Sequence, residues 1–361
     1  ILSFYMLSLS KISLKNFSCF SSLSIDLSPG TNFFYGKNGS GKTSILEAIY
    51  LCSSGSSFKS SNIQSLISHS KNAFDIAGYD ESSGYILNIT KNRIQPISIS
   101  LNNSKATRAD LTKEFPCMAI HNNTYSFASA SPDFRRKLLD RSLFICEHEF
   151  YEAWFSFYRA LKQRNALLKS NMLQELEAWN EKFCTLGKNL TNLRNVFFRS
   201  TLSELKILLE KIYELTNNNI LNKISFDFYQ GWPIDKSLED SLDAVYRKDL
   251  VRRTSAVGPH KADIRLLIEG LDARQILSRG EQKLLSIMWC CAQNEVLKKK
   301  YNLSPTLLID DIKSELDSLS FDSFLSVLNE LNNQIIFSCI DDLFSSKIRT
   351  NIKKFHVEQF K

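Results

Sequence analysis

The stretch Gly36-Lys37-Asn38-Gly39-Ser40-Gly41-Lys42-Thr43 decides the fold of this chain. It fits G-x-x-x-x-G-K-[ST], the phosphate-binding P-loop, which requires a strand before it and a helix after it. Residues 30–35 predict a short buried strand, and residues 44–52 carry apolar side chains at a helical spacing. Glycines let backbone N–H groups curl around phosphate oxygens, and the helix start adds its positive dipole end. We therefore predict a nucleotide site in which Lys42 reaches the β- and γ-phosphates and the Thr43 hydroxyl holds Mg²⁺.

The composition indicates a globular protein and predicts no membrane span. The chain has 361 residues, 43 % of them apolar, and no run of about 18 apolar residues. Residues 1–14 alternate apolar residues with Ser and Lys, which predicts a strand and not a signal peptide; Met6 is an alternative natural start, with Ile1 to Tyr5 as an upstream extension. Eight scattered cysteines without a C-x-x-C pair indicate neither a zinc site nor a redox pair, and we infer a reducing cytoplasm.

The charge balance is mildly basic. The net charge is +7 and the pI is near 8.9. Such an excess of Lys and Arg suits a polyanionic partner such as nucleic acid, but an ordinary basic protein would look the same. Charge alone therefore leaves both interpretations open.

A pair of carboxylates follows a buried strand late in the chain. Residues 306–309 predict a parallel core strand that ends in Asp310-Asp311, as in a Walker B motif. In that interpretation Asp310 holds Mg²⁺ through water and Asp311 polarises the attacking water. The alternative is a solvated acidic loop, but behind a P-loop the sequence favours the functional interpretation.

The segment Ser278-Arg279-Gly280-Glu281-Gln282 opens a helix that carries a regular apolar stripe from Leu284 to Ala292. Ser278 is a good N-cap residue, so a purely structural role is one interpretation. The functional interpretation is an ABC-type signature, in which Ser278, Gly280 and the helix N-terminus bind the γ-phosphate held by another subunit's P-loop. The order of the three motifs favours the second interpretation.

The organisation predicted is α/β, with an ABC-type ATPase head whose mixed sheet has flanking helices. Residues 1–145 form its N-terminal part with the P-loop, and residues 251–361 form its C-terminal part with the signature and Walker B. Between them, residues 146–250 predict an α-helical second lobe or short antiparallel arm, because 147–217 lack Pro and show long helical periodicity. Strands are predicted at 7–14, 23–27, 76–79, 85–89, 262–270, 271–276, 306–309 and 334–338, and shorter helices at 237–253 and 321–331.

The chain resembles the RecF family of SMC-like ABC ATPases over nearly its whole length. The matching segments are Ser13–Phe17, Ser28–Asn32, the P-loop with Leu46–Leu51, Gly55–Lys59, Ser131–Arg141, Leu161–Leu168, Gly258–Asp263 and Leu308–Asp317. A general P-loop scaffold does not supply so many separate matches in order.

The resemblance implies an ATP-dependent, DNA-binding protein of recombinational repair and replication restart. Two molecules would close head to tail on two ATP with Mg²⁺, each site combining one P-loop with the opposing Ser278. The dimer would clamp duplex DNA beside a single-stranded gap and, with RecR and RecO, help to load recombinase. Slow, DNA-stimulated hydrolysis would open the clamp, in the cytoplasm and without a membrane partner.

The chain departs from the family's pattern at several positions. Asn123 and Thr124 stand in the lid loop where the family tends to have acids, Lys59 replaces an Arg, Ala262 replaces an Asp, and Glu281 replaces a Gln. No switch histidine follows the last core strand, at Ser338-Cys339-Ile340-Asp341, but the family generally lacks one as well. The residues Lys42, Thr43, Ser278, Asp310 and Asp311 are all present.

Several other residues have both a structural and a functional interpretation. His260 either supports a turn or is linked to the nucleotide, and Arg135 and Arg136 are either helix-face charges or phosphate contacts. The basic residues of the arm are either a solvated face or phosphate contacts, and its aromatic cluster is expected to serve packing and not base stacking. The basic residues of the arm are Lys162, Arg164, Lys169, Lys182 and Lys188. Its aromatic cluster consists of Trp154, Phe155, Phe157 and Tyr158.

Two alternatives to the clamp share its motifs. The first is the ATPase subunit of a membrane transporter, but the 278 − 41 = 237 residues between P-loop and signature exceed what a compact transporter ATPase needs. The second is a non-hydrolysing DNA-binding relative, because Asp311 is shorter than the Glu usual in ABC ATPases. DNA-stimulated ATPase activity separates the clamp from both.

Overall fold

The computed structural model describes residues 8–170, 172, 174–348 and 351–360. These residues fall into two compact units. The first unit contains the residues up to Tyr125, Glu214–Asn217 and the residues from Lys283 onward. The second unit contains Ser126–Tyr213 and Asn218–Gln282. The predicted arm, 146–250, lies in the second unit apart from 214–217, and that unit also includes 126–145 and 251–282. The functional division at 145 and 250 stays a prediction.

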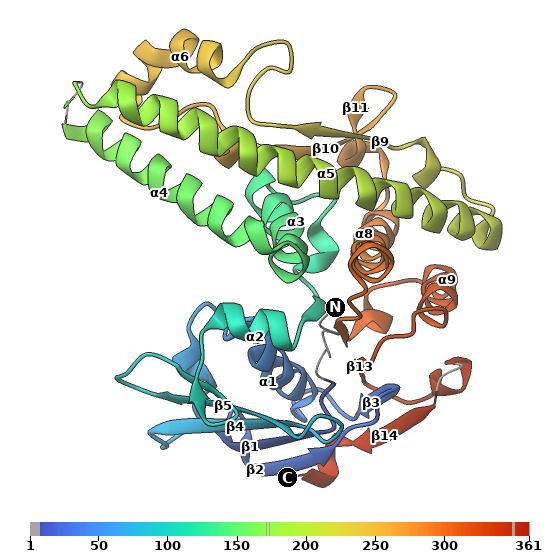
Figure 1. The fold of residues 1–361 in the computed structure, drawn as a ribbon. Coiled ribbons are helices and arrows are strands. Elements are labelled where there is room, and N and C mark those ends of the chain that lie inside the picture. Colours follow the sequence, from blue (N-terminus) through green and yellow to red (C-terminus); the bar gives the residue numbers. More distant parts are fainter. Residues whose placement is uncertain (1–7, 171, 173, 349–350, 361) are drawn as a thin grey trace. The chain divides into compact units, whose positions relative to one another are not determined.

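The P-loop strand lies inside a five-stranded parallel sheet of the first unit (Figure 1). Each strand is a short apolar run, as expected for strands buried on both faces. The strands that the sequence predicted at 30–35, 306–309 and 334–338 are confirmed as β3, β12 and β13. In sheet order the strands are β14 (Ile352–His356), β3 (Thr31–Tyr35), β13 (Ile335–Cys339), β12 (Thr306–Asp310) and β8 (Cys117–Ile120).

A six-stranded antiparallel sheet completes the sheets of the first unit. Its first strand begins at Lys11, four residues later than predicted, and residue 7 lies outside the described residues. The predicted strands at 76–79 and 85–89 are confirmed within longer ones, and the strand predicted at 23–27 is confirmed up to Asp26. In sheet order the strands are β2 (Phe20–Asp26), β1 (Lys11–Phe17), β4 (Ala73–Asp80), β5 (Tyr85–Asn92), β6 (Ser98–Leu101) and β7 (Ser104–Lys105).

The helix that follows the P-loop, α1 (Lys42–Ser54), packs against strands of both sheets. This position explains why Ile45, Leu46, Ile49 and Leu51 are all fully buried although they point in different directions around the helix. The dense packing fixes the start of α1, and with it the P-loop, to the carboxyl ends of the parallel strands. Other helices with residues in this unit are α2 (Arg108–Glu114), α8 (Arg279–Tyr301), which starts in the second unit, α9 (Ser318–Leu328) and the end of α5 (Leu176–Thr216).

The second unit is mainly helical, with one small antiparallel sheet (Figure 1). The long helices predicted between 147 and 217 are confirmed as α4 (His148–Ser170) and α5 (Leu176–Thr216). The unit also contains α3 (Pro132–Cys146), α6 (Leu238–Arg252), α7 (Ala273–Ile276) and the strands β9 (Ser225–Tyr229), β10 (Asp263–Ile268) and β11 (Leu271–Asp272). Within the described ranges, no helix is long and apolar enough to cross a membrane.

The strand predicted at 271–276 is wrong beyond its first two residues. The backbone pairs with β10 only at Leu271 and Asp272 and then forms the short helix α7. Asp272 caps this helix, because its carboxylate accepts a hydrogen bond from the N–H of Arg274 at 2.9 Å. A local N-cap therefore overrides the apolar pattern that suggested a strand.

Two buried arginines hold the helices of the second unit together. Arg194 on α5 makes two 2.7 Å hydrogen bonds to the carboxylate of Asp140 on α3. Arg164 on α4 bonds Asp249 on α6 at 2.7 Å, and both side chains are fully buried. The prediction that Arg164 belongs to a solvated or phosphate-binding basic face is therefore wrong, because its guanidinium is enclosed by protein.

Replacing Asp249 with Ala is expected to lower the free energy of unfolding by about 3–5 kcal/mol, because it leaves the Arg164 charge buried without its partner. The matched control is Asp227→Ala, which removes an exposed ion pair to Arg265 and should cost at most about 1 kcal/mol. Urea denaturation followed by circular dichroism measures both. Equal effects of the two substitutions would contradict the structural role of the buried pair.

Candidate nucleotide-binding site

The P-loop adopts a backbone conformation that requires its glycines. Gly39 and Gly41 have φ angles of 77° and 112°, in the left-handed region. A Cβ atom on Gly41 would lie 2.5 Å from a ring carbon of Phe20 and 2.8 Å from the sulfur of Cys19, so no larger residue fits there. Gly41 is also the N-cap of α1 and makes no side-chain cap bond. The helix start therefore presents backbone N–H groups to an anion.

Lys42 lies at the centre of the loop and bonds the loop's own backbone. Its ammonium donates to the carbonyl of Gly36 at 2.6 Å and to that of Lys37 at 2.8 Å. Burial lowers the pKa of Lys42, and the nearby Asp311 is the largest of the opposing influences. An ammonium has three N–H donors, so Lys42 keeps one for a phosphate oxygen while it holds the loop closed.

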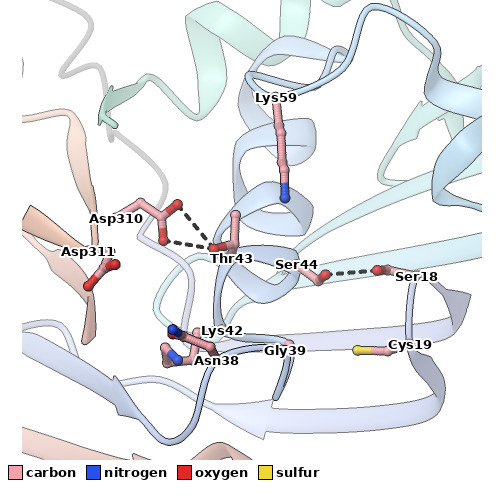
Figure 2. Close-up of a pocket in the computed structure, with 11 residues that line it drawn as sticks. Ser18, Cys19, Asn38, Gly39, Lys42, Thr43, Ser44, Lys59, Asp310 and Asp311 are labelled. Atoms are coloured by element: carbon pink, nitrogen blue, oxygen red, sulfur yellow. Dashed lines mark hydrogen bonds between the residues drawn. The ribbon is translucent and has the colours of Figure 1, made fainter. Parts of the chain in front are cut away.

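The predicted metal-binding residues, Thr43 and Asp310, lie side by side in the fold although 267 positions separate them in the sequence. The Thr43 hydroxyl donates to both carboxylate oxygens of Asp310 at 3.1 Å (Figure 2). The same carboxylate accepts a 2.6 Å hydrogen bond from the hydroxyl of Ser338 on β13. A hydroxyl and a carboxylate are the hard oxygen ligands that Mg²⁺ prefers, so these residues fit the ion.

Asp311, the proposed water-polarising residue, is held in an unusual conformation. Its φ is 48°, and its backbone N–H donates to the carbonyl of Ser338 at 3.2 Å. One carboxylate oxygen accepts from the Ser314 hydroxyl at 3.0 Å, whereas the other is buried without a hydrogen-bond partner among the residues that the structure describes. Burial raises the pKa of Asp311, with the adjacent Asp310 contributing in the same direction. A carboxylate with a raised pKa and an open acceptor suits a general base.

These residues line one open pocket of the first unit, with a volume of about 250 Å³ (Figure 2). Its lining includes most of the predicted P-loop residues and both aspartates. It also contains four residues that were not predicted as site residues: Ser18, Cys19, Ser44 and Lys59. The hydroxyls of Ser18 and Ser44 bond each other at 2.8 Å, which ties the turn between β1 and β2 to the start of α1. No sequence motif links that turn to the P-loop, because only the packing of α1 brings them together.

Two further hydrogen bonds hold the backbone of the site residues in place. The Tyr125 hydroxyl donates to the carbonyl of Asp310 at 3.0 Å, and Glu358 accepts from the backbone N–H of Lys37 at 3.0 Å. Sequence reasoning missed both, because they lie far from the motifs along the chain. In the lid loop, the Thr124 hydroxyl donates to the carbonyl of Ala119 at 3.1 Å, and neither Thr124 nor Asn123 lines the pocket.

The predicted signature residues Ser278 and Gly280 belong to the second unit and are described there by themselves. Ser278 and Glu281 form a capping box, because the Ser278 hydroxyl accepts from the N–H of Glu281 at 3.3 Å and Glu281 accepts from the N–H of Ser278 at 2.8 Å. Asn218 also donates to Glu281 at 2.9 Å. Burial alone would raise the pKa of Glu281, but the hydrogen bonds from Asn218 and Ser278 outweigh it. Glu281, which stands where the family usually has Gln, thus caps the start of α8.

Three residues with open interpretations take part in internal bonds of the second unit. Arg135 makes two hydrogen bonds to Asp263, at 2.8 and 2.9 Å, and Arg136 donates to the carbonyl of Ala262 at 2.5 Å. His260 contacts the carbonyl of Ser255 at 3.0 Å, and burial lowers the pKa of His260 to about 4. These contacts favour the structural interpretation for all three.

Comparisons with known proteins agree with this geometry. The RecF/RecN/SMC N terminal domain family matches residues 8–361. The DNA replication and repair protein RecF of Pseudoalteromonas translucida is 34 % identical over 363 residues, covering 98 % of each chain. The protein of the same name from Colwellia psychrerythraea is 31 % identical and covers 93 % of this chain and 89 % of its own.

Solved structures show the same fold. The recombination mediator protein RecF with ATPrS, of the RecFOR pathway, superposes with a TM-score of 0.81 at 23 % identity and covers 98 % of this chain and 97 % of its own. An Smc head bound to the C-winged helix domain of ScpA superposes with a TM-score of 0.56 at 18 % identity, covering 96 % and 93 %. The predicted fold class, an ABC-type head of the RecF and SMC kind, is confirmed.

Proposed function

This chain belongs to the RecF/RecN/SMC N terminal domain family, and from that premise we propose that it is an ATP-dependent DNA-binding clamp of recombinational repair and replication restart. The observation that carries the proposal is the single pocket that joins Lys42, Thr43, Asp310 and Asp311. Two buried polar atoms at this site, Oγ of Ser40 and Oδ1 of Asp311, have no partner among the described residues. Such atoms support a site built for a polar ligand.

The residues of the pocket have separable roles in the proposed hydrolysis. Lys42 and the N–H groups at the start of α1 bind and orient the phosphates of ATP. Thr43 and Asp310 would hold Mg²⁺, which supplies positive charge to the transferring phosphoryl group. Asp311 orients the attacking water and accepts its proton. Ser338 keeps both aspartates in place through its hydroxyl and its carbonyl.

The clamp is a homodimer that ATP assembles head to tail. Ser278, Gly280 and the N–H groups at the start of α8 complete the site on the P-loop of the other molecule. The closed dimer holds duplex DNA next to a single-stranded gap in the cytoplasm and acts there with RecR and RecO to load recombinase. Hydrolysis separates the heads and releases the DNA.

The experiment that tests this function is steady-state ATP hydrolysis with and without gapped DNA. We expect a slow basal rate that gapped duplex increases. ATP binding without turnover would instead support the non-hydrolysing relative, and turnover that ignores DNA would contradict the clamp. The full-length similarity to RecF proteins already argues against a transporter ATPase.

Lys59 is expected to strengthen ATP binding, and Lys59→Ala to weaken it about tenfold. Figure 2 shows the side chain of Lys59 extending toward the start of α1. Its loop is fixed by the Ser57 hydroxyl, which donates to the buried Glu47 and accepts from the N–H of Lys59 at 3.0 Å. Titration with a fluorescent ATP analogue measures the affinity.

The control for this substitution is Lys105→Ala, which removes an exposed lysine on β7 of the same unit, outside the pocket. It should leave the affinity unchanged. Equal affinities for wild type and Lys59→Ala would show that the lysine makes no contact with the nucleotide.

A further inference from the structure

One exposed face of α4 carries a stripe of aromatic and basic side chains. Positions three or four apart lie on the same face of a helix. Here such positions are occupied by two aromatic residues and then by two basic ones, and a third basic residue lies two helical turns further on; all of them are exposed. In chain order the residues of this stripe are Tyr151, Phe155, Arg159, Lys162 and Lys169. From the first to the last, the stripe is about 27 Å long at 1.5 Å per residue.

The two aromatic rings form a flat platform that is open to solvent. Tyr151 and Phe155 are 51 % and 52 % exposed, which contradicts the prediction that Phe155 is a packing residue. Their rings are nearly parallel, with an interplanar angle of 9° and centroids 6.3 Å apart. The inner neighbours hold the platform in place, because Phe144 contacts Tyr151 edge-on at 6.4 Å and also packs against Trp154. Large rings kept in place but half exposed suggest a surface for another flat group.

The basic part of the stripe is free to bind anions. Arg159, Lys162 and Lys169 have no ion-pair partner among the residues that the structure describes. This distinguishes them from Arg164, on the opposite face of the same helix, whose charge is neutralised by Asp249. The stripe therefore combines a positive track with a stacking platform, the combination typical of single-strand binding surfaces.

We propose that this face of α4 binds a single-stranded nucleic acid, with bases stacked on Tyr151 and Phe155 and phosphates on Arg159, Lys162 and Lys169. The proposal rests on the proposed function and extends it, because it assigns the single-stranded part of a gapped substrate to one helix. A protein partner would need both acidic groups for the three cations and a flat group for the aromatic pair. A sugar–phosphate chain with exposed bases matches both halves of the stripe.

The test measures binding of the full-length protein with ATP to three labelled probes: oligo-dT, an abasic oligomer of equal length, and duplex DNA. Tyr151→Ala combined with Phe155→Ala should weaken oligo-dT binding at least about fivefold and leave binding of the abasic oligomer unchanged. Arg159→Ala combined with Lys162→Ala should weaken both single-stranded probes. It should also reduce the slope of log affinity against log salt by about 1.4, because two phosphate contacts are lost.

The matched control is Lys206→Ala combined with Ile207→Ala, which removes an exposed lysine and an exposed apolar side chain from α5. It should bind all three probes like the wild type. Phe155→Tyr should bind oligo-dT like the wild type whereas Phe155→Leu should bind it more weakly, since only an aromatic ring stacks on a base.

The outcomes separate this proposal from the proposed function. If the wild type binds none of the probes, the DNA-binding function itself is wrong. If the wild type binds DNA and the stripe variants bind equally well, only the assignment to α4 is overturned. If Phe155→Leu binds oligo-dT like the wild type, the face does not stack bases, and the proposal is likewise overturned.

Discussion

The substitution Asp311→Asn is expected to reduce ATP hydrolysis by about 10²–10⁴-fold, the contribution of a positioned general base. Binding of ATP should stay close to that of the wild type, because Lys42, Thr43 and the P-loop backbone are untouched. Asn keeps the size of the side chain and the acceptor for the Ser314 hydroxyl, so the turn after β12 should persist. Single-turnover hydrolysis with saturating enzyme measures the rate, and a fluorescent ATP analogue measures the affinity.

The rate–pH profile provides an independent check on Asp311. A general base must be ionised, so the rate should rise with pH as Asp311 loses its proton and should then level off. Because burial raises the pKa of Asp311, this rise should lie at a higher pH than for an exposed aspartate. The rate of the Asn variant should not show this rise with pH.

The control for Asp311→Asn is Asp322→Asn, an exposed carboxylate on α9 that pairs with Lys347 outside the pocket. It should hydrolyse ATP at the wild-type rate. A fully active Asp311→Asn protein would show that another group polarises the water. A wild type that binds ATP without turnover would favour the non-hydrolysing alternative.

The second large effect concerns Ser278, whose replacement by Arg is expected to abolish the ATP-dependent dimer. In the proposed assembly the Ser278 helix end binds the γ-phosphate on the opposing molecule, and a bulky side chain there blocks the approach. The variant should still bind ATP through its own P-loop. Molecular mass in solution with ATP and gapped DNA, and with ADP as control, distinguishes monomer from dimer.

The capping role of Ser278 requires a second variant. Loss of the cap alone costs about 1 kcal/mol of helix stability, so Ser278→Arg combines two effects. Asp is an equally good N-cap but places a negative charge against the phosphate, so Ser278→Asp should keep the fold and lose the dimer. Ser237→Ala removes the cap of α6, where the Ser237 hydroxyl accepts from the backbone N–H of Asp240, and this variant should still dimerise. If Ser278→Asp dimerises like the wild type, the composite site is wrong.

Much of the fold could be predicted because its signals are local. A P-loop is recognised from eight adjacent residues, and the strand before it and the helix after it follow from apolar spacing over short distances. The same holds for the strand that ends in Asp310-Asp311 and for α4 and α5. Where a local pattern was ambiguous, as at 271–276, the N-cap of Asp272 decided for a helix after two strand residues.

The side-chain environments could not be predicted, because they depend on packing between distant segments. Helical periodicity cannot say which basic residue is enclosed: Arg164 is fully buried, whereas Arg159 and Lys162 on the same helix are exposed. Likewise, the aromatic residues 154–158 looked alike in sequence, but the fold buries Phe157 and leaves Phe155 half exposed.

The sequence by itself thus predicted the family, which the comparisons confirm, and the candidate residues for phosphate binding, because each motif is a contiguous chemical pattern. Only the tertiary structure decided which of these residues lie next to one another. The parallel register of β12 and β13 places Asp310 beside Ser338, and α1 carries Thr43 to the same edge of the sheet. The turn at Ser18 joined the pocket only through the packing of α1 between two sheets. Contacts across more than two hundred residues depend on the packed core, which no local pattern specifies.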